Sequence, residues 1–142
     1  MKLQDKYLAL GNNGCLALCY LTAAAYDAAS DEEKNIYGYI DTMVSTIALA
    51  ALGTRELSED AFVLDAERLM TSVANNKYKV TKKIAESWED VPKTGWCCVN
   101  FVNGNFNHWI LAKDGFRFFD SKENSECVKN GKIADLRIIE RV

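Results

Sequence analysis

The chain has 142 residues, of which 49% are hydrophobic and 26% are charged, and its formal net charge is −3. This length allows one sizeable core, and an acidic balance is not typical of proteins that bind nucleic acids or anionic membranes. The five cysteines are odd in number and are not spaced as a disulfide framework. Residues 1–6 lack the apolar segment of a signal peptide, so together with the cysteine pattern we expect a cytoplasmic protein. The acidic charge leads us to expect a partner that is neither nucleic acid nor membrane.

The first part of the chain, residues 1–76, is predicted to be mainly helical. A loop over 11–14 precedes an apolar run that predicts a buried helix from Cys15 to about Ala29. A cap at Ser30 and the acidic residues after it predict a second helix that ends near Leu52. A third, amphipathic helix is predicted from 58 to 76, because apolar residues recur there at helical spacing.

The second part, residues 77–142, is predicted to be mainly β. Residues 78–84 alternate in polarity as an edge strand does, and 96–102, 106–113 and 116–120 are rich in aromatic and β-branched residues. The turns between these last three segments contain Gly104 and Gly115, which predicts an antiparallel meander. Residues 136–142 are expected to add a final strand.

Three residues form the candidate catalytic group: Cys15, His108 and Asp120. A thiol in the first turn of a helix is near the positive end of the helix dipole, which stabilises its nucleophilic thiolate form. His108 is the only histidine of the chain and lies near the start of one predicted strand, while Asp120 ends the next. A Cys–His pair oriented by a carboxylate is the layout of a papain-type nucleophilic site.

The hairpin between these two strands decides whether His108 and Asp120 lie on one face. A three-residue loop over 113–115 places Asp120 directly opposite His108. A two-residue loop at Asp114 and Gly115 places Asp120 opposite Trp109, on the wrong face of the sheet. The triad therefore requires the longer loop or a bulge.

Two segments resemble a known family. The sequences Asn13-Gly14-Cys15-Leu16-Ala17-Leu18 and 107–121 are similar to an uncharacterised family of spirochaetes and phages, as is the tail 129–133. That family in turn resembles the bacteriocin-processing, C39-like branch of the papain-like cysteine peptidases. The resemblance implies a papain-like fold and a Cys–His–Asp hydrolase.

The chain departs from the peptidase pattern at the oxyanion hole. Papain-like enzymes usually carry a Gln shortly before the Cys, whereas the position six before Cys15 is Ala9. The candidate amide donors are therefore Asn12, Asn13 and the more distant Gln4. Removing one oxyanion donor typically costs ~10²–10³ in rate.

We thus expect one α+β domain of papain-like fold over 1–142, with a helical layer on an antiparallel meander. The expected function is a thiol hydrolase, a cysteine peptidase or amidase that acts on a peptide-like bond, with Trp109 as a substrate contact. No cofactor and no metal site are expected, because one histidine and no second cysteine pair are available. Two alternatives are an inactive module of the same fold that binds a peptide or protein, and a redox sensor using Cys15 and Cys19.

Overall fold

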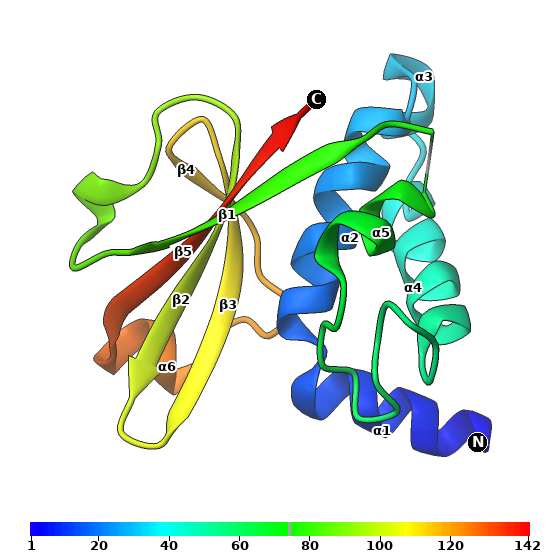
Figure 1. Ribbon diagram of the computed structural model, residues 1–142, viewed down its shortest axis with the longest axis horizontal. Helices are drawn as coiled ribbons and strands as arrows, with labels where there is room; N and C mark the ends of the chain where they lie inside the picture. Colours follow the sequence, from blue (N-terminus) through cyan, green and yellow to red (C-terminus); the bar gives the residue numbers. More distant parts are fainter. Residues whose placement is uncertain (74) are drawn as a thin grey trace. The chain divides into compact units, whose positions relative to one another are not determined.

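The computed structural model describes residues 1–73 and 75–142 and divides the chain into two compact units, 1–77 and 78–142. We call them the helical unit and the sheet unit (Figure 1). The described α-helices are α1 (Leu3–Asn13), α2 (Cys15–Ala28), α3 (Asp31–Lys34), α4 (Tyr39–Ala51), α5 (Ala66–Thr71) and α6 (Glu126–Asn130). The strands are β1 (Tyr78–Ile84), β2 (Trp96–Asn103), β3 (Phe106–Lys113), β4 (Phe116–Phe119) and β5 (Lys132–Arg141), and a 3₁₀ helix, η1, covers Trp88–Asp90. The expected α+β class is confirmed.

Helix α2 is the core of the helical unit. Its residues from Cys19 to Ala25 are all buried, and it packs against α1, α4 and α5. An α-helix that is apolar on nearly all sides gains most when neighbours surround it, and its small alanines allow them to approach closely. The helix predicted to start at Cys15 is confirmed.

The segment before Cys15 differs from the expected loop. Residues up to Asn13 belong to α1, and only Gly14 separates α1 from α2. The two helices are bent by 92° at this break. The glycine and asparagines of 11–14 favour turns, but the backbone N–H of Gly14 bonds to Leu10 O, so α1 continues to Asn13.

The second predicted helix is broken in two. Helix α3 ends at Lys34, and α4 begins at Tyr39 after Gly38, which has φ 77°. A residue in this left-handed region cannot continue a right-handed helix. The capping box expected at Ser30 is present: its hydroxyl accepts from Glu33 N, and Glu33 accepts from Ser30 N.

The third predicted helix, 58–76, is wrong over most of its length. Only α5 is helical, Ala74 lies outside the described residues, and Phe62 of the expected apolar face is 56% exposed. Side-chain hydrogen bonds that form a turn and a helix cap override the helical spacing of the apolar residues in this segment. Ser58 Oγ accepts from Phe62 N, Ala61 has φ 67°, and Asp65 Oδ1 starts α5 by accepting from Arg68 N.

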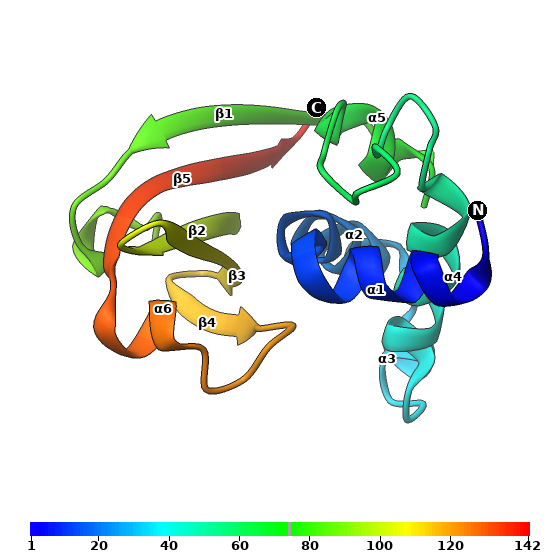
Figure 2. The same ribbon diagram turned by 90° about the horizontal axis from the view of Figure 1, so that it is seen from below.

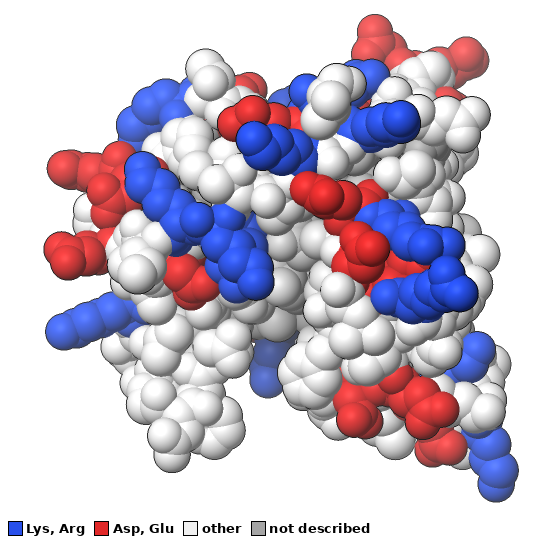
Figure 3. Space-filling view, viewed as in Figure 1, with Lys and Arg blue, Asp and Glu red and all other residues white. Residues whose placement is uncertain are grey.

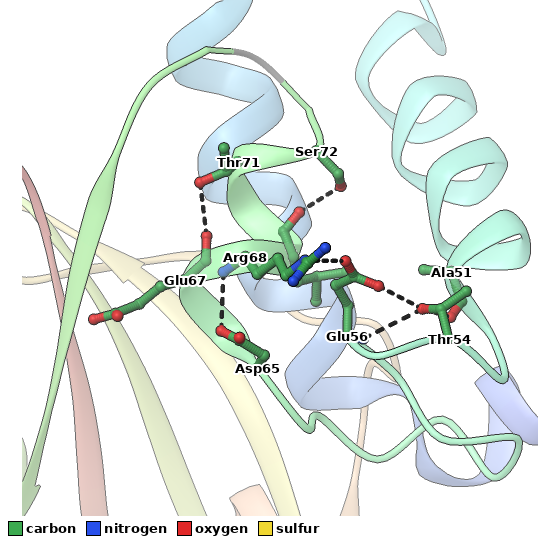
Figure 4. A network of polar contacts seen from close by, with 9 residues as sticks. Ala51, Thr54, Glu56, Asp65, Glu67, Arg68, Thr71 and Ser72 are labelled. Atoms are coloured by element: carbon green, nitrogen blue, oxygen red, sulfur yellow. Dashed lines mark hydrogen bonds and ion pairs between the residues drawn. The ribbon is translucent and has the colours of Figure 1, made fainter.

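A polar network secures the segment between α4 and α5 (Figure 4). Arg68 Nε lies 2.9 Å from Glu56 Oε1, and Thr54 Oγ1 donates to Glu56 Oε2 at 2.6 Å. The Thr54 hydroxyl is the main reason that the pKa of Glu56 lies below its ordinary value. The carboxylate thus links the loop to the helix that follows it.

The sheet unit contains one five-stranded antiparallel sheet of order β1-β5-β2-β3-β4, visible from top to bottom in Figure 2. Strands β2, β3 and β4 form the expected meander, and β1 is the expected edge strand. Strand β5 returns between β1 and β2. The start predicted for this strand, residue 136, lies four residues after its start in the structure.

One face of this sheet carries the core of the sheet unit. Across β2 and β3, Phe101 pairs with His108, Val99 with Ile110 and Cys97 with Ala112. We call their shared side the dyad face, after the bonded pair of His108 and Asp120 that it carries. It packs on Trp88 of η1 and on Cys127 and Val128 of α6.

The lysines of β1 are exposed. Lys79, Lys82 and Lys83 all face solvent, and positively charged side chains gather over this region in Figure 3. Charged residues on an edge strand hinder pairing with other chains. In the described part of the chain, no single helix is both long and apolar enough to cross a membrane; α1 and α2 pass that test only as a bent pair.

Candidate functional site

Cys15 is the first residue of α2, so its thiol lies at the N-terminal end of a buried helix. The first-turn N–H groups of an α-helix lack intrahelical acceptors, and the helix dipole is positive there. No acidic residue stands in the first turn to oppose a thiolate. Cys15 itself is only partly buried, whereas Cys19 one turn later is fully buried.

Gly14 holds Cys15 in place through close backbone contact. It ends α1 by donating to Leu10 O and begins α2 by accepting from Leu18 N, at 2.9 Å in both cases. A Cβ atom on Gly14 would lie 2.5 Å from Leu10 O and 2.9 Å from Leu10 Cα. Only glycine therefore permits the sharp junction that presents Cys15 at a helix start.

His108 and Asp120 lie together in the sheet unit. His108 Nε2 is 2.5 Å from Asp120 Oδ1, and the same oxygen accepts from the backbone N–H of Lys122 at 2.9 Å. The histidine side chain is 7% exposed and the aspartate 26%. The carboxylate is thus fixed by the turn that follows β4, and it orients the imidazole so that any transfer of a proton uses Nδ1.

A β-bulge places these two residues on one face. The turn at Asp114 and Gly115 is the two-residue form, with φ 52° and 84° and with Lys113 paired to Phe116. The register then shifts, so that Ala112 pairs with Arg117 but Leu111 pairs with Phe119. The extra residue returns Asp120 to the face of His108, one diagonal step along the ladder. Of the two solutions considered for the triad, the structure has the bulge.

The oxyanion candidates all belong to α1. Asn12 and Asn13 stand in its last turn, just before Gly14 and Cys15. Gln4 is nine residues before Asn13 on the same helix, roughly 13 Å along its axis at 1.5 Å per residue. This distance exceeds the reach of its side chain, so Asn12 and Asn13 remain the candidates near the thiol.

Trp109 lies on the opposite face of the sheet from His108, because neighbouring residues of a strand point to opposite sides. Its ring stacks under the Arg137 guanidinium at 4.7 Å. Arg137 and Asn100 both bond to Asp135, and Asn107 donates to Asn100. Sequence reasoning missed this polar row, and its placement separates Trp109 from the dyad.

The Cys15–Cys19 redox alternative conflicts with helix geometry. Residues at i and i+4 of a helix have Cβ atoms ~5–6 Å apart, whereas a disulfide requires ~3.5–4.5 Å. Oxidation would therefore have to unwind α2, the most buried helix of its unit. Within the described residues, no group of three His, Cys, Asp or Glu side chains is arranged to hold a metal ion.

Comparisons of the chain with protein-family models, with curated proteins and with solved structures find no match. A functional assignment therefore rests on the chemistry of Cys15, His108 and Asp120.

Proposed function

We propose that the protein is a papain-like thiol hydrolase, a cysteine peptidase or amidase, in which Cys15, His108 and Asp120 act together. The observation that carries the proposal is the His108–Asp120 bond. This bond depends on the β-bulge of the hairpin, since without the bulge Asp120 would lie on the opposite face of the sheet. A carboxylate that orients the only histidine of the chain, combined with a cysteine at a helix start, is the set of groups that thiol catalysis needs.

The reaction follows from these roles. The Cys15 thiolate attacks the carbonyl carbon of the peptide bond, and the oxyanion is stabilised by the Cys15 N–H and an Asn12 or Asn13 amide. The His108 imidazolium gives its Nδ1 proton to the leaving amine, and a thioester remains on Cys15. Neutral His108 then takes a proton from water, whose hydroxide displaces the thiolate and releases a carboxylic acid. Asp120 orients the ring throughout.

The decisive test measures how fast Cys15 reacts with iodoacetamide between pH 4 and pH 9, read by peptide mapping. If His108 forms an ion pair with Cys15, alkylation persists at mildly acidic pH, where ordinary thiols of pKa ~8.5 are protonated. His108→Gln keeps an amide that can bond to Asp120 and is expected to abolish this acidic reactivity. Equal profiles in the wild-type and His108→Gln proteins would refute the proposal.

Cys97 provides an internal reference in the same spectra. Burial raises the pKa of the Cys97 thiol to about 12, so it stays protonated and unlabelled while the chain is folded. Labelling of Cys97 would report unfolding rather than activation.

Turnover is tested on a library of N-acetylated peptides, with cleavage detected by mass spectrometry. The wild-type chain is expected to cleave a subset, and Cys15→Ala to cleave none. An activated Cys15 without any cleavage would instead support the alternative, an inactive binding module of the same fold.

A further inference from the structure

A groove of about 350 Å³ opens on the dyad face of the sheet unit. It is lined by Trp88, Phe101, Gly115, Phe116, Arg117 and Ile133. Phe101 is the direct cross-strand partner of His108, so the groove begins one residue away from the dyad. Its walls come from η1, from three strands and from the hairpin turn.

The groove contains one cation held over aromatic rings. The Arg117 guanidinium carbon lies 5.7 Å from the ring centres of both Trp88 and Phe101. Among the described residues, no carboxylate lies within ion-pair distance of Arg117, although the chain has more acidic than basic side chains. Stacking orients the planar guanidinium and leaves its N–H groups able to bind a carboxylate in a bidentate manner.

The wall beside Arg117 is fixed by hydrogen bonds. Trp88 Nε1 donates to Gly115 O at 2.9 Å, and Asp114 exchanges two bonds with Gly95, through its N–H and through its side chain. The stem of Lys93 lies against Gly115, close enough that a Cβ there would be 3.2 Å from Lys93 Cδ. Lys93, an exposed cation, therefore has its side-chain stem beside the hairpin turn that lines the groove.

Two of the nearby acidic groups are already hydrogen-bonded. Asp120 is bonded to His108 and to Lys122 N, and Asp90 accepts from the backbone N–H groups of Glu86 and Ser87. Glu89 of η1 is exposed. In the described structure, none of these three carboxylates forms an ion pair with Arg117.

We propose that this groove binds an acidic side chain of an extended peptide. The carboxylate pairs with Arg117, with Lys93 as a second positive charge, and the methylene stem lies against Trp88 and Phe101. The inference rests on the proposed function for its meaning: the hydrolase would select peptides with Asp or Glu near the bond to be cleaved. Binding itself does not require Cys15.

The test uses the full chain with Cys15→Ala, so that no peptide is consumed. Two N-acetylated, C-amidated pentapeptides are titrated, each with alanines around a central Glu or a central Gln, and binding is followed through the Trp88 indole N–H signal by NMR. The Glu peptide is expected to bind about tenfold tighter or more, the usual value of a charge-assisted pair. Equal affinities, or no binding of either peptide, would overturn the proposal.

Arg117→Gln is expected to abolish the difference between the two peptides. Arg141→Gln is the matched control: it makes the same charge change eight residues beyond Ile133 on β5, roughly 26 Å away along the strand, and is expected to preserve the difference. Arg117→Glu should reverse the preference toward a peptide with a central Lys. Identical selectivity in the wild-type and Arg117→Gln chains would show that Arg117 only covers apolar surface.

The two proposals fail separately. If the chain binds the Glu peptide selectively but the wild-type chain cleaves no peptide, the groove proposal stands and the hydrolase proposal is refuted. If the wild-type chain cleaves library peptides without a preference for acidic residues, the hydrolase proposal stands and the groove proposal is refuted.

Discussion

The helical unit and the sheet unit hold their candidate site residues by different means. Cys15 owes its position to backbone packing, because Gly14 touches Leu10 so closely that no side chain fits between them. His108 owes its orientation to a side-chain bond with Asp120, which exists because one extra residue shifts the hairpin register. The thiol is thus sensitive to added volume, and the dyad is sensitive to strand register.

The largest effect is expected from adding volume at the helix junction. Gly14→Ala places a methyl group 2.5 Å from Leu10 O, a backbone atom that cannot move without disturbing α1. We expect it to lower the free energy of unfolding by about 3 kcal/mol, the upper part of the range for overpacking, as measured by thermal denaturation.

Gly11→Ala is the matched control, because a Cβ on Gly11 has no neighbour within 4 Å and the residue is helical. Alanine is the better helix former, so this variant should be stabilised by about 0.5–1 kcal/mol. Equal changes in both variants would show that the contact between Gly14 and Leu10 does not constrain the junction.

A smaller effect is expected from the sheet unit. Asp120→Ala removes the partner of a buried imidazole and should cost about 1–2 kcal/mol, as for other unsatisfied buried groups.

Deleting Phe118 removes the extra residue of the β-bulge and should turn Asp120 to the opposite face of the sheet. Because His108 is the only histidine, its imidazole N–H signal can be followed without assignment, and both variants should make that N–H exchange faster with water.

The Phe118 deletion also tests whether the register of β4 is what positions Asp120. Adding Asp120→Ala to the Phe118 deletion should cost almost nothing further, since the bond is already lost. Full additivity of the two changes would mean that the bulge does not position Asp120.

Local signals predicted the sheet unit better than the helical unit. Glycine-containing turns between aromatic strands define neighbours directly, so the meander over 96–119 followed from the sequence. The bulge at the end of β4 did not, because no residue there encodes an insertion; it appeared only as a condition for bringing His108 and Asp120 together. The groove was missed because Trp88, Phe101 and Arg117 are distant in sequence and meet only through the topology.

The helical unit shows why periodicity alone misleads. Apolar residues at helical spacing over 58–76 predicted a long helix. Instead, Leu57 is fully buried and forms isolated β-bridges with Leu52 and Val63. Ser58 begins a turn, because its hydroxyl accepts a hydrogen bond from Phe62 N. Helix α1 was missed because the glycine and asparagines near its end resemble a loop. In contrast, α2 was predicted well, since its burial requires only that it be apolar all round.

The smallest effect concerns the wall of the groove and depends on pH. The backbone N–H groups of Glu86 and then Ser87 hold the pKa of Asp90 below its ordinary value of 3.8. A lowered folded pKa means that the folded state binds its proton less readily than the unfolded chain. The contribution of Asp90 to stability is therefore fully present above about pH 4 and is lost as the pH falls through the folded pKa. Asp90→Asn should flatten the fall in melting temperature below pH 4, and Glu89→Gln, which makes the same charge change beside it, should not. If both variants keep the wild-type slope, the bonds that Asp90 accepts from Glu86 and Ser87 do not hold η1 in place, and Trp88 is fixed by its bond to Gly115 and its packing against the sheet.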